Sequence, residues 1–314
     1  MLFRKYGLKV FALALVLALS FGCLTACEDF EDILNSLIPP EEPFVPGPDV
    51  GGDPIPVSGS LKVHFIDVGQ ADCVLVETSG SYMLIDTGDT DNDYTEKIIN
   101  YLDNVGVETL DYLILTHPDA DHIGGAPEII NEYKIGHCIM PDFTKTTKIF
   151  ESTIDALEEN QVDVIEAVPG FEFIVGEADC RILAPLNEYD DANDASVVIK
   201  MIFGSTSFLL TGDAEKESEA DIVEYYSAEQ LKSTVMKSGH HGSRTSSSEA
   251  LLEAVDPDFI VISCGEDNKY GHPHEETIDR YEEMGIPYYR TDISGTVIVS
   301  SDGENVSVTC EKQS

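Results

Sequence analysis

The chain has 314 residues, of which 59 are acidic and 18 are basic, and its formal net charge at pH 7 is −41. Such a length, with 42% hydrophobic residues, is enough for one large α/β domain with a sizeable core. The charge excludes a general attraction to phosphate backbones and is the largest argument against a nucleic-acid substrate. Divalent cations bound at a site could reverse the sign of the field locally.

The first 26 residues predict an export signal. Three basic residues precede a short apolar segment at 10–19, and Leu24-Thr25-Ala26-Cys27 resembles a bacterial lipobox. We therefore expect cleavage before Cys27, lipid attachment to its thiol, and a protein held on the extracellular face of a bacterial membrane. An ordinary secretory signal is the alternative, and it also exports the protein. Cleavage would remove the three basic residues and take the net charge from −41 to −44.

Residues 27–60 are acidic and rich in proline and glycine, a composition that cannot bury enough apolar surface to fold. They are predicted to form a tether, and residues 61–314 the folded domain. After loss of the signal and lipidation of Cys27, five cysteines remain without a Cys-x-x-Cys pair, so we expect core thiols and no disulfide framework.

The first half of the domain predicts strands over 61–68, 73–77, 82–85, 112–115 and 135–140. The first three, joined by tight turns, predict an antiparallel meander. Helices are expected over 94–104, where Gly106 stops the helix, and over 146–160.

The second half predicts short strands near 162–165, 171–174 and 180–183, and a hairpin of 197–203 with 206–210. After a helix at 215–226, strands and helices alternate over 234–237, 247–254, 259–263, 274–284 and 287–289, and a strand pair closes the chain at 295–310. Two β-rich halves with helices suggest an α/β fold of two sheets packed face to face with the helices outside.

One stretch, Thr116-His117-Pro118-Asp119-Ala120-Asp121-His122-Ile123-Gly124-Gly125, carries four potential metal ligands in a strand-to-helix turn. Imidazole and carboxylate suit zinc, and carboxylate-rich sites also accept manganese. An acidic turn in which Asp119 or Asp121 caps the next helix is the alternative. The flanking histidines at this spacing favour a metal site.

Three later turns carry similar residues. Asp213 follows the hairpin, where a carboxylate could bridge two metals or cap the next helix. His240 and His241 end a strand between glycines, which allow a close approach to a ligand. His272 follows the strand at 259–263, whereas His274 is expected to cap a helix or face solvent. The resulting candidates all lie beyond strand ends, the usual side for ligands in α/β sheets: His117, Asp119, Asp121, His122, Asp213, His240, His241 and His272.

At these residues the chain resembles the metallo-β-lactamase superfamily, whose signature is His-x-His-x-Asp-His. Within it, the chain is most similar to the hydrolase domain of ComEC-type DNA-uptake proteins. The segments that carry the resemblance are Phe65–Gln70, Thr116–Gly125, Leu210–Asp213, Gly239–Ser243 and Tyr270–Pro273. The resemblance implies an αββα sandwich with a metal centre between the sheets.

The resemblance also implies a ligand set for one or two Zn or Mn ions. His117 and Asp119 would serve one metal, Asp121 and His122 the other, Asp213 would bridge them, and His272 would complete the second. Asp119 replaces the superfamily's histidine, a change that the ComEC-like branch shares. The station before the hairpin, usually histidine, here reads Asp191–Ser196, so the first site is expected to be weak, empty or occupied by manganese.

The expected activity is metal-assisted hydrolysis of a phosphoester by a phosphodiesterase or nuclease-like enzyme. Asp121 would be essential, His240 or His241 would protonate the leaving group or bind a metal, and Ser243 would contact phosphate oxygens or act as a cap. DNA follows from the resemblance, although the sequence lacks the long apolar segments of a DNA channel and is not expected to transport it. The alternatives are a smaller phosphodiester, such as a phosphorylcholine headgroup or a nucleotide, and a lipid-anchored protein that binds metal without turnover.

Overall fold

The computed structural model describes residues 57–312. The predicted signal segment 1–26, its cleavage, the lipidation of Cys27 and residues 27–56 of the predicted tether lie outside the described residues. Within 57–312, no helix has the length and apolar character needed to cross a lipid bilayer.

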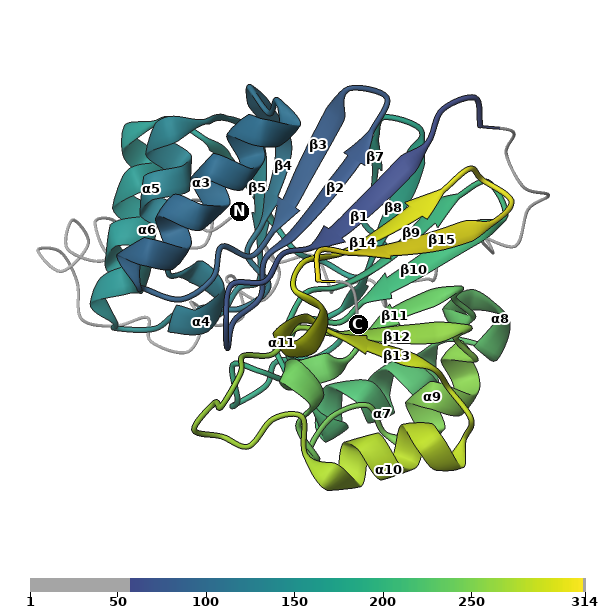
Figure 1. Cartoon of the computed structure of the whole chain (residues 1–314). Coiled ribbons are helices and arrows are strands. Elements are labelled where there is room, and N and C mark those ends of the chain that lie inside the picture. Colours follow the sequence, from purple (N-terminus) through teal and green to yellow (C-terminus); the bar gives the residue numbers. More distant parts are fainter. Residues whose placement is uncertain (1–56, 313–314) are drawn as a thin grey trace, which may run out of the picture. The chain divides into compact units, whose positions relative to one another are not determined.

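Two mixed sheets form the centre of the domain (Figure 1). The first has the strand order β15-β14-β1-β2-β3-β4-β5-β6. Its strands are β1 (Leu61–Phe65), β2 (Val74–Thr78), β3 (Ser81–Ile85), β4 (Thr109–Ile114), β5 (Lys134–Met140), β6 (Asp163–Glu166), β14 (Val297–Ser301) and β15 (Val306–Cys310). The predicted antiparallel meander of β1, β2 and β3 is confirmed by their register.

The second sheet has the order β13-β12-β11-β10-β9-β8-β7. Its strands are β7 (Glu172–Val175), β8 (Ala178–Ala184), β9 (Val198–Phe203), β10 (Thr206–Leu210), β11 (Val235–Lys237), β12 (Phe259–Ile262) and β13 (Tyr288–Arg290). The strands β10 to β13 run parallel, so their carboxyl ends share one edge. In the first sheet, β3, β4, β5 and β6 are also parallel.

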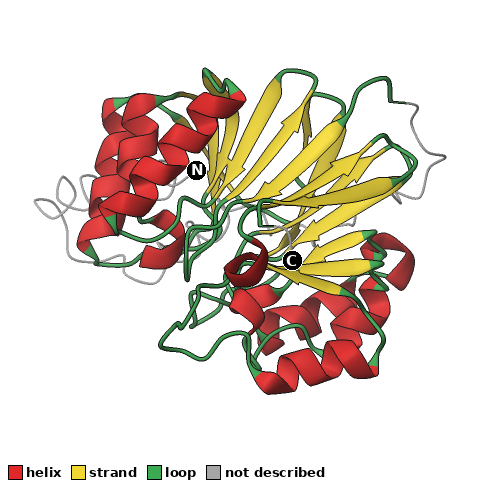
Figure 2. Ribbon diagram, in the orientation of Figure 1, coloured by secondary structure: helices red, strands yellow, loops and turns green. Residues whose placement is uncertain are grey.

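Helices cover the outer face of each sheet, and Figure 2 shows them in red flanking the yellow strands. The first sheet carries α3 (Asn92–Val105), α4 (Ala120–Ile123), α5 (Ala126–Glu132) and α6 (Lys148–Glu159). In the second half lie α7 (Lys216–Tyr225), α8 (Ala228–Leu231), α9 (Glu249–Val255), α10 (Glu275–Glu283) and α11 (Thr291–Ser294). The expected αββα arrangement is therefore confirmed.

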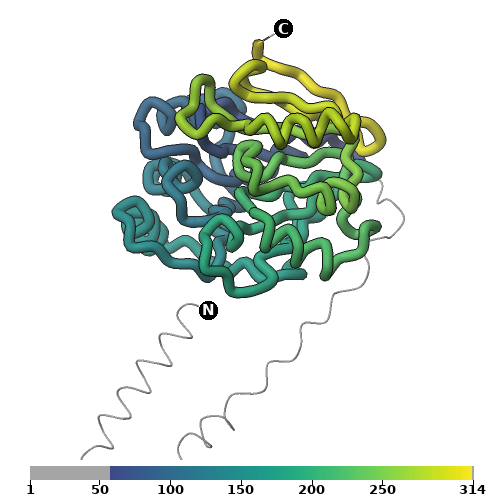
Figure 3. Tube along the Cα trace, turned by 90° about the horizontal axis from the view of Figure 1, so that it is seen from below, coloured from purple at the N-terminus to yellow at the C-terminus, as the bar shows by residue number. Residues whose placement is uncertain are grey.

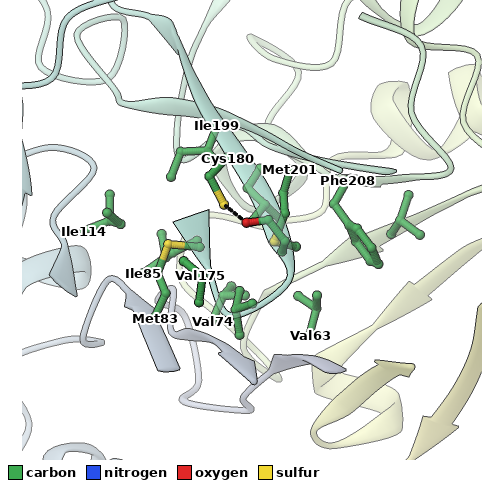
Figure 4. Close-up of a cluster of buried hydrophobic side chains, with 14 of the residues drawn as sticks. Val63, Val74, Met83, Ile85, Ile114, Val175, Cys180, Ile199, Met201 and Phe208 are labelled. Carbon is green, nitrogen blue, oxygen red and sulfur yellow. Dashed lines mark hydrogen bonds between the residues drawn. The ribbon is translucent and has the colours of Figure 1, made fainter. Parts of the chain in front are cut away.

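Three clusters of buried apolar side chains hold the two sheets and the two sets of helices together. The middle one lies between the sheets, where side chains such as Val74, Ile199 and Phe208 meet (Figure 4). A second cluster packs the first sheet against α3, α5 and α6, and a third packs the other sheet against α7, α9 and α10. Strands buried on both faces explain why most of them appear in the sequence as continuous apolar runs.

Local signals set the ends of the helices. Asp91 begins α3 by accepting a hydrogen bond from the Asp93 amide, and Gly106 ends it in the left-handed conformation, with φ 92°. Within α3, Ile98 and Leu102 are buried on the face toward the sheet, as their spacing predicts. The observed helix is two residues longer at its start and one residue longer at its end than the predicted range of 94–104.

The C-terminal strands return to the beginning of the domain. Residues of β14 pair antiparallel with β1, from Leu61 opposite Ser301 to Phe65 opposite Val297, and Figure 3 shows this last segment in yellow. Sequence patterns predicted the strand pair but not its place beside β1. Of the five predicted core cysteines, Cys73, Cys138, Cys180 and Cys264 are buried free thiols; Cys310, on an edge strand, is only partly buried.

Candidate metal centre

The turn after β4 holds His122 through a buried carboxylate. Asp86, which directly follows β3, accepts hydrogen bonds from the Thr116 amide (2.8 Å) and hydroxyl (2.6 Å). The other contact of Asp86 is to His122, at 2.7 Å between Oδ2 and Nδ1. Because β3 and β4 are parallel neighbours, their ends bring these residues together. A carboxylate on Nδ1 fixes the imidazole tautomer and leaves Nε2 as the atom with a free lone pair.

His117 belongs to the same turn and is also buried. Its Nδ1 lies 3.1 Å from the Thr116 hydroxyl and 3.3 Å from the Ser196 hydroxyl. Ser196 in turn accepts the Asp213 amide at 3.1 Å, which connects the turn after β4 to the turn after β10. Burial lowers the pKa of His117 well below its usual range, so this ring is neutral, as a metal ligand must be.

The paired histidines occupy a strained turn, Gly239–Gly242, directly after β11. Both adopt the left-handed region, with φ 45° at His240 and 53° at His241. Such a conformation costs on the order of 1–3 kcal/mol per non-glycine residue and clusters at functional sites. His241 is buried and donates from Nδ1 to the Ser263 carbonyl (3.0 Å), which again leaves Nε2 free.

Asp213 is the point on which these rings converge. Its Oδ2 lies 3.2 Å from Nε2 of His122 and 3.5 Å from Nε2 of His241. Nε2 of His117, His122 and His241 and Oδ1 of Asp213 are all buried without a hydrogen-bond partner. The alternative of Asp213 as a helix cap is wrong, because Glu215 occupies the N-cap position of α7 and the Asp213 carboxylate faces the histidines.

The electrostatics of the cluster show an excess of buried negative charge. Burial alone would lower the pKa of His241, but the carboxylates of Asp213 and Asp72 raise it to about 10. Asp213 and Asp86 likewise outweigh burial and raise the pKa of His122 well above its usual range. Without a cation, the negative charge of the carboxylates therefore favours the protonated forms of His122 and His241. A divalent cation would supply the same charge and leave the imidazoles as ligands.

Two buried residues extend the cluster. Asp72, in the turn before β2, lies with Oδ2 2.6 Å from Nζ of Lys237, the last residue of β11. Against the effect of burial, Lys237 and then His241 lower the pKa of Asp72 to about 2. Lys237 also donates to the carbonyls of Gly212 and Ser238, at 3.0 Å each. It therefore ties the turns that carry Asp72, Asp213 and the paired histidines.

His240 lies at the rim and has a carboxylate partner of its own. Its Nδ1 is 2.7 Å from Oε1 of Glu215, and its Nε2 is 3.7 Å from Oδ2 of Asp213. About a quarter of its side chain is exposed. Although burial lowers it, the hydrogen bond with Glu215 and the charge of Asp213 raise the pKa of His240. Glu215 also accepts from the Thr245 hydroxyl at 2.9 Å, which fixes the carboxylate.

The structure brings together five of the predicted site residues with ligand atoms close enough for a shared cation. Within 57–312, groups of three ligand atoms that lie within 4.8 Å of one another include His117/His122/Asp213 and Asp121/His122/His241. Two further groups add Asp72 and Asp86. Asp121 belongs here through its Oδ2, 3.5 Å from Nε2 of His241. His122 and Asp213 each belong to more than one group. The groups therefore overlap, as the ligands of one cation or of two adjacent cations would.

Four predicted site residues lie outside these groups: His240, at the rim, and three others. Asp119 occupies the N-cap position of α4 without making a cap hydrogen bond, and its carboxylate pairs with Lys145. The Ser243 hydroxyl bonds to the Thr245 hydroxyl (2.8 Å) and accepts the Thr245 amide (3.3 Å), so both of these hydrogen bonds stay within its own turn. His272 lies beside the cluster, with its ring centroid 5.3 Å from that of His240.

Hydrogen bonding gives His272 a different character from the other rings. Gln70 accepts the Gly265 amide on Oε1 (3.0 Å), so its Nε2 donates to Nδ1 of His272 (3.2 Å). The proton of the neutral ring therefore resides on Nε2, which makes that atom a donor. Burial and then the neighbouring histidines lower the pKa of His272 to about 4, which keeps the ring neutral. His274 does not cap α10 with its side chain; its Nδ1 accepts the Arg244 amide.

The donor set fits a divalent metal ion. Three imidazole nitrogens, two of which would give up their protons to a bound cation, suit Zn and Mn alike when combined with carboxylate oxygens. The Nε2 atoms of these three rings are buried and have no hydrogen-bond partner. Each ring is oriented by a hydrogen bond on its other nitrogen, to Asp86, to Ser196 and Thr116, or to the Ser263 carbonyl. This outer set of partners is typical of metal-ligating histidines.

Two sheets between helices, with a buried His/Asp cluster at one edge, define the class: an αββα fold with a candidate metal centre. Residues 66–266 match the metallo-beta-lactamase superfamily, and the chain belongs to it. ComE operon protein 3 of Bacillus subtilis is 31% identical over 258 residues, covering 77% of this chain and 33% of that protein. Competence protein ComA of Neisseria gonorrhoeae is 35% identical over 233 residues, with 74% and 31% covered.

These relatives are ComEC-type competence proteins, and the chain spans about a third of their length. Among solved structures, the metallo-beta-lactamase fold protein YhfI of Bacillus subtilis superposes with a TM-score of 0.54 at 13% identity, over 78% of this chain and all of that one. At such low identity the likeness supports the fold alone, and it agrees with the sandwich described above.

Sequence reasoning missed Asp72, Asp86, Lys237, Gln70 and Glu215. The rule that found the other candidates also applies to Asp86, because it directly follows β3, whose parallel partner is β4. Lys237 ends β11 and is separated from the paired histidines by Ser238 and Gly239, and the sequence pattern marks it only as part of the strand at 234–237. Gln70 ends a segment that carries the resemblance, and Asp72 follows it, but neither shows its role in the sequence, because their partners lie more than 160 residues away along the chain.

Proposed function

We propose that the domain is a metal-dependent phosphodiesterase. The observation that carries the proposal is the gathering of three buried imidazole rings, whose Nε2 atoms have no hydrogen-bond partner, around the Asp213 carboxylate. His117, His122, His241, Asp121 and Asp213 would hold the ion or ions, with Asp72 and Asp86 behind them. A divalent metal bound there would supply an activated water at neutral pH and positive charge for the phosphoryl oxygens.

The chain's own residues divide the remaining work. His240 is half-buried at the rim, carries a raised pKa and presents Nε2 toward the site, so it would give the proton to the leaving oxygen. Glu215 orients that ring through Nδ1. His272, with its proton on Nε2, would donate a hydrogen bond to a phosphoryl oxygen. Asp119, paired with Lys145, and Ser243, paired with Thr245, take no direct part in this assignment.

The role of Glu215 can be tested by its pH signature. Glu215→Gln keeps the size of the side chain but removes the charge that raises the pKa of His240. Because the ring then loses its proton at lower pH, the alkaline limb of the kcat/KM profile should move to lower pH. We expect kcat to fall by about tenfold, less than the roughly 10²–10⁴-fold for loss of the acid itself, because His240 is still present, and we expect unchanged metal content. Glu276→Gln, on an exposed carboxylate, is the control; an unchanged profile in Glu215→Gln would remove Glu215 from this role.

The activity itself is tested with a panel of substrates. Purified protein with added Mn²⁺ or Zn²⁺ should hydrolyse a fluorogenic phosphodiester and leave nitrocefin, a β-lactam, intact. Asp121→Ala should abolish this hydrolysis while circular dichroism shows a folded domain, because Asp121 supplies a ligand oxygen beside His241. Turnover of nitrocefin alone, or full phosphodiesterase activity in Asp121→Ala, would contradict the proposal. Metal binding without any turnover would instead favour a protein that binds metal without catalysis.

The names of the relatives suggest a link with DNA uptake, so single-stranded DNA belongs in the same panel. The net charge of −41 opposes long-range attraction of a polynucleotide. We further propose, from the N-terminal sequence alone, that the enzyme works outside the cell, anchored by a lipid on Cys27. Metabolic labelling with a fatty acid should mark the wild-type protein and not Cys27→Ala.

A further inference from the structure

The loop between β12 and α10 carries an exposed aromatic ring next to the site. Tyr270 is 52% exposed. Of the large hydrophobic residues that are exposed within 57–312, it is the one whose loop also holds a site histidine. Its ring stacks on His272, with centroids 5.7 Å apart and planes at 25°. His272 in turn lies nearly parallel to His241, at 6.3 Å and 27°. A row of flat rings therefore leads from solvent to the candidate metal centre.

The loop holds this ring in a fixed place. The Asn268 side chain accepts the amides of Tyr270 (3.2 Å) and His272 (3.0 Å) and donates to the Gly265 carbonyl (2.9 Å). Gln70 fastens both ends of the loop through the Gly265 amide and the His272 ring. No core packing explains the Tyr270 side chain, because more than half of it faces water. Exposure of a rigidly mounted aromatic ring points to a ligand.

We propose that Tyr270 is a stacking platform for a nucleobase that flanks the scissile phosphate. This inference rests on the proposed phosphodiester chemistry and names its substrate class: a nucleotide or the end of a single nucleic-acid strand. Base–aromatic stacking requires only a flat π-face and tolerates any base. Only the His272 ring lies between Tyr270 and His241 of the candidate metal centre. This position suits a base that is joined through its sugar to the phosphate being cleaved.

The charge around Tyr270 favours a base over a choline-type headgroup. Nζ of Lys269 already lies over the Tyr270 ring, 4.8 Å from its centroid. A quaternary ammonium would have to compete with this cation for the electron-rich face. A neutral base replaces Lys269 without charge repulsion, and the freed ammonium can then pair with a phosphate. Lys269 is fully exposed, so its displacement requires no repacking.

Two substrates with the same leaving group test the proposal: the p-nitrophenyl ester of thymidine 5′-monophosphate and methyl p-nitrophenyl phosphate, both with Mn²⁺-loaded protein. We expect Tyr270→Ala to raise KM for the thymidine ester by about 5- to 150-fold, the range for loss of one stacked base. Tyr270→Phe should behave like wild type, and the methyl ester should change less than twofold. Tyr225→Ala, an exposed tyrosine on α7, is the matched control.

An equal rise in KM for both esters in Tyr270→Ala would overturn the proposal, because it would show that Tyr270 contacts the shared p-nitrophenyl leaving group and not the base. So would a thymidine ester that is unaffected by Tyr270→Ala. If wild type hydrolyses neither ester, the phosphodiesterase proposal fails, and calorimetric binding then decides the stacking. Thymidine 5′-monophosphate should bind wild type and Tyr270→Phe at least fivefold more tightly than Tyr270→Ala. Tyr270-independent binding would contradict it.

A short single strand of thymidines distinguishes the two sources of the base. If the free nucleotide is the ligand, the mononucleotide and the oligonucleotide should show equal dependence on Tyr270, and the oligonucleotide should gain no affinity. If a strand end is the ligand, the oligonucleotide should bind more tightly, with an affinity that falls as salt rises. Either result supports the platform if Tyr270→Ala weakens binding of the ligand concerned. If Tyr270→Ala weakens binding of neither the mononucleotide nor the oligonucleotide, the proposal is contradicted.

Discussion

Asp213→Asn should abolish metal-dependent hydrolysis while leaving the fold intact. The substitution preserves the shape of the side chain but removes the charge on which His122 and His241 converge, at 3.2 and 3.5 Å. Because Asp213 belongs to two of the four ligand groups found within 57–312, each of these two groups loses a charged oxygen donor. We expect kcat/KM to fall by at least about 10³-fold, comparable to the loss of a directly acting catalytic group, together with a loss of bound metal.

The control for Asp213→Asn is Asp163→Asn, which removes an equal charge from an exposed position on β6. This variant should retain full activity and metal content. Circular dichroism and thermal melting of the metal-free proteins separate loss of function from loss of fold. An Asp213→Asn protein that still binds metal with wild-type affinity would show that Asp213 serves only as a partner for the buried histidines.

Lys237→Met should have the largest effect on stability. Lys237 and Asp72 form an ion pair at 2.6 Å, and each side chain is at most 3% exposed. Removing one member of a buried pair leaves the other charge uncompensated, which costs about 3–5 kcal/mol. Here the uncompensated Asp72 lies beside Asp86 and Asp213, so a value at the upper end of that range is expected. Urea unfolding of the metal-free protein measures the change in the free energy of unfolding.

A double variant and a second buried lysine give the necessary controls. Asp72→Asn combined with Lys237→Met should recover most of the lost free energy of unfolding, since it removes the buried charge. Lys200→Met is the matched control, because Lys200 is equally buried but donates to the Leu231 carbonyl and the Ser233 hydroxyl. Asp72→Asn should not rescue it. Additive losses in the Asp72/Lys237 double variant would show that the two residues do not depend on each other.

The sequence predicted the elements well because their signals are local. Alternating or continuous apolar runs located the strands, and Asp91 and Gly106 marked the ends of α3. The pairing of β14 with β1 is different, because strands more than 230 residues apart share no pattern that names the partner. The two-sheet architecture followed from the motifs and the resemblance, whereas the position of the last strands required the structure.

The candidate site divides in the same way. Residue types that rarely occur together, such as His240 beside His241, were visible in the sequence, and the structure brings His117, Asp121, His122, Asp213 and His241 within reach of one another. Whether a side chain faces the cluster depends on partners that spacing does not reveal. Lys145 holds Asp119, Thr245 holds Ser243, and Gln70 sets the proton of His272. Lys237 was missed because a lysine inside an apolar strand gives no sign of the carboxylate it meets.

Metal stoichiometry tests the central claim most directly. The domain spanning residues 57–314, purified without chelator and dialysed against Mn²⁺ or Zn²⁺, should carry one or two metal ions per chain by mass spectrometry, and none after His122→Ala, because His122 is shared by three of the ligand groups. A folded wild-type domain that holds no stoichiometric metal, or a His122→Ala variant that binds as much as wild type, would contradict the account.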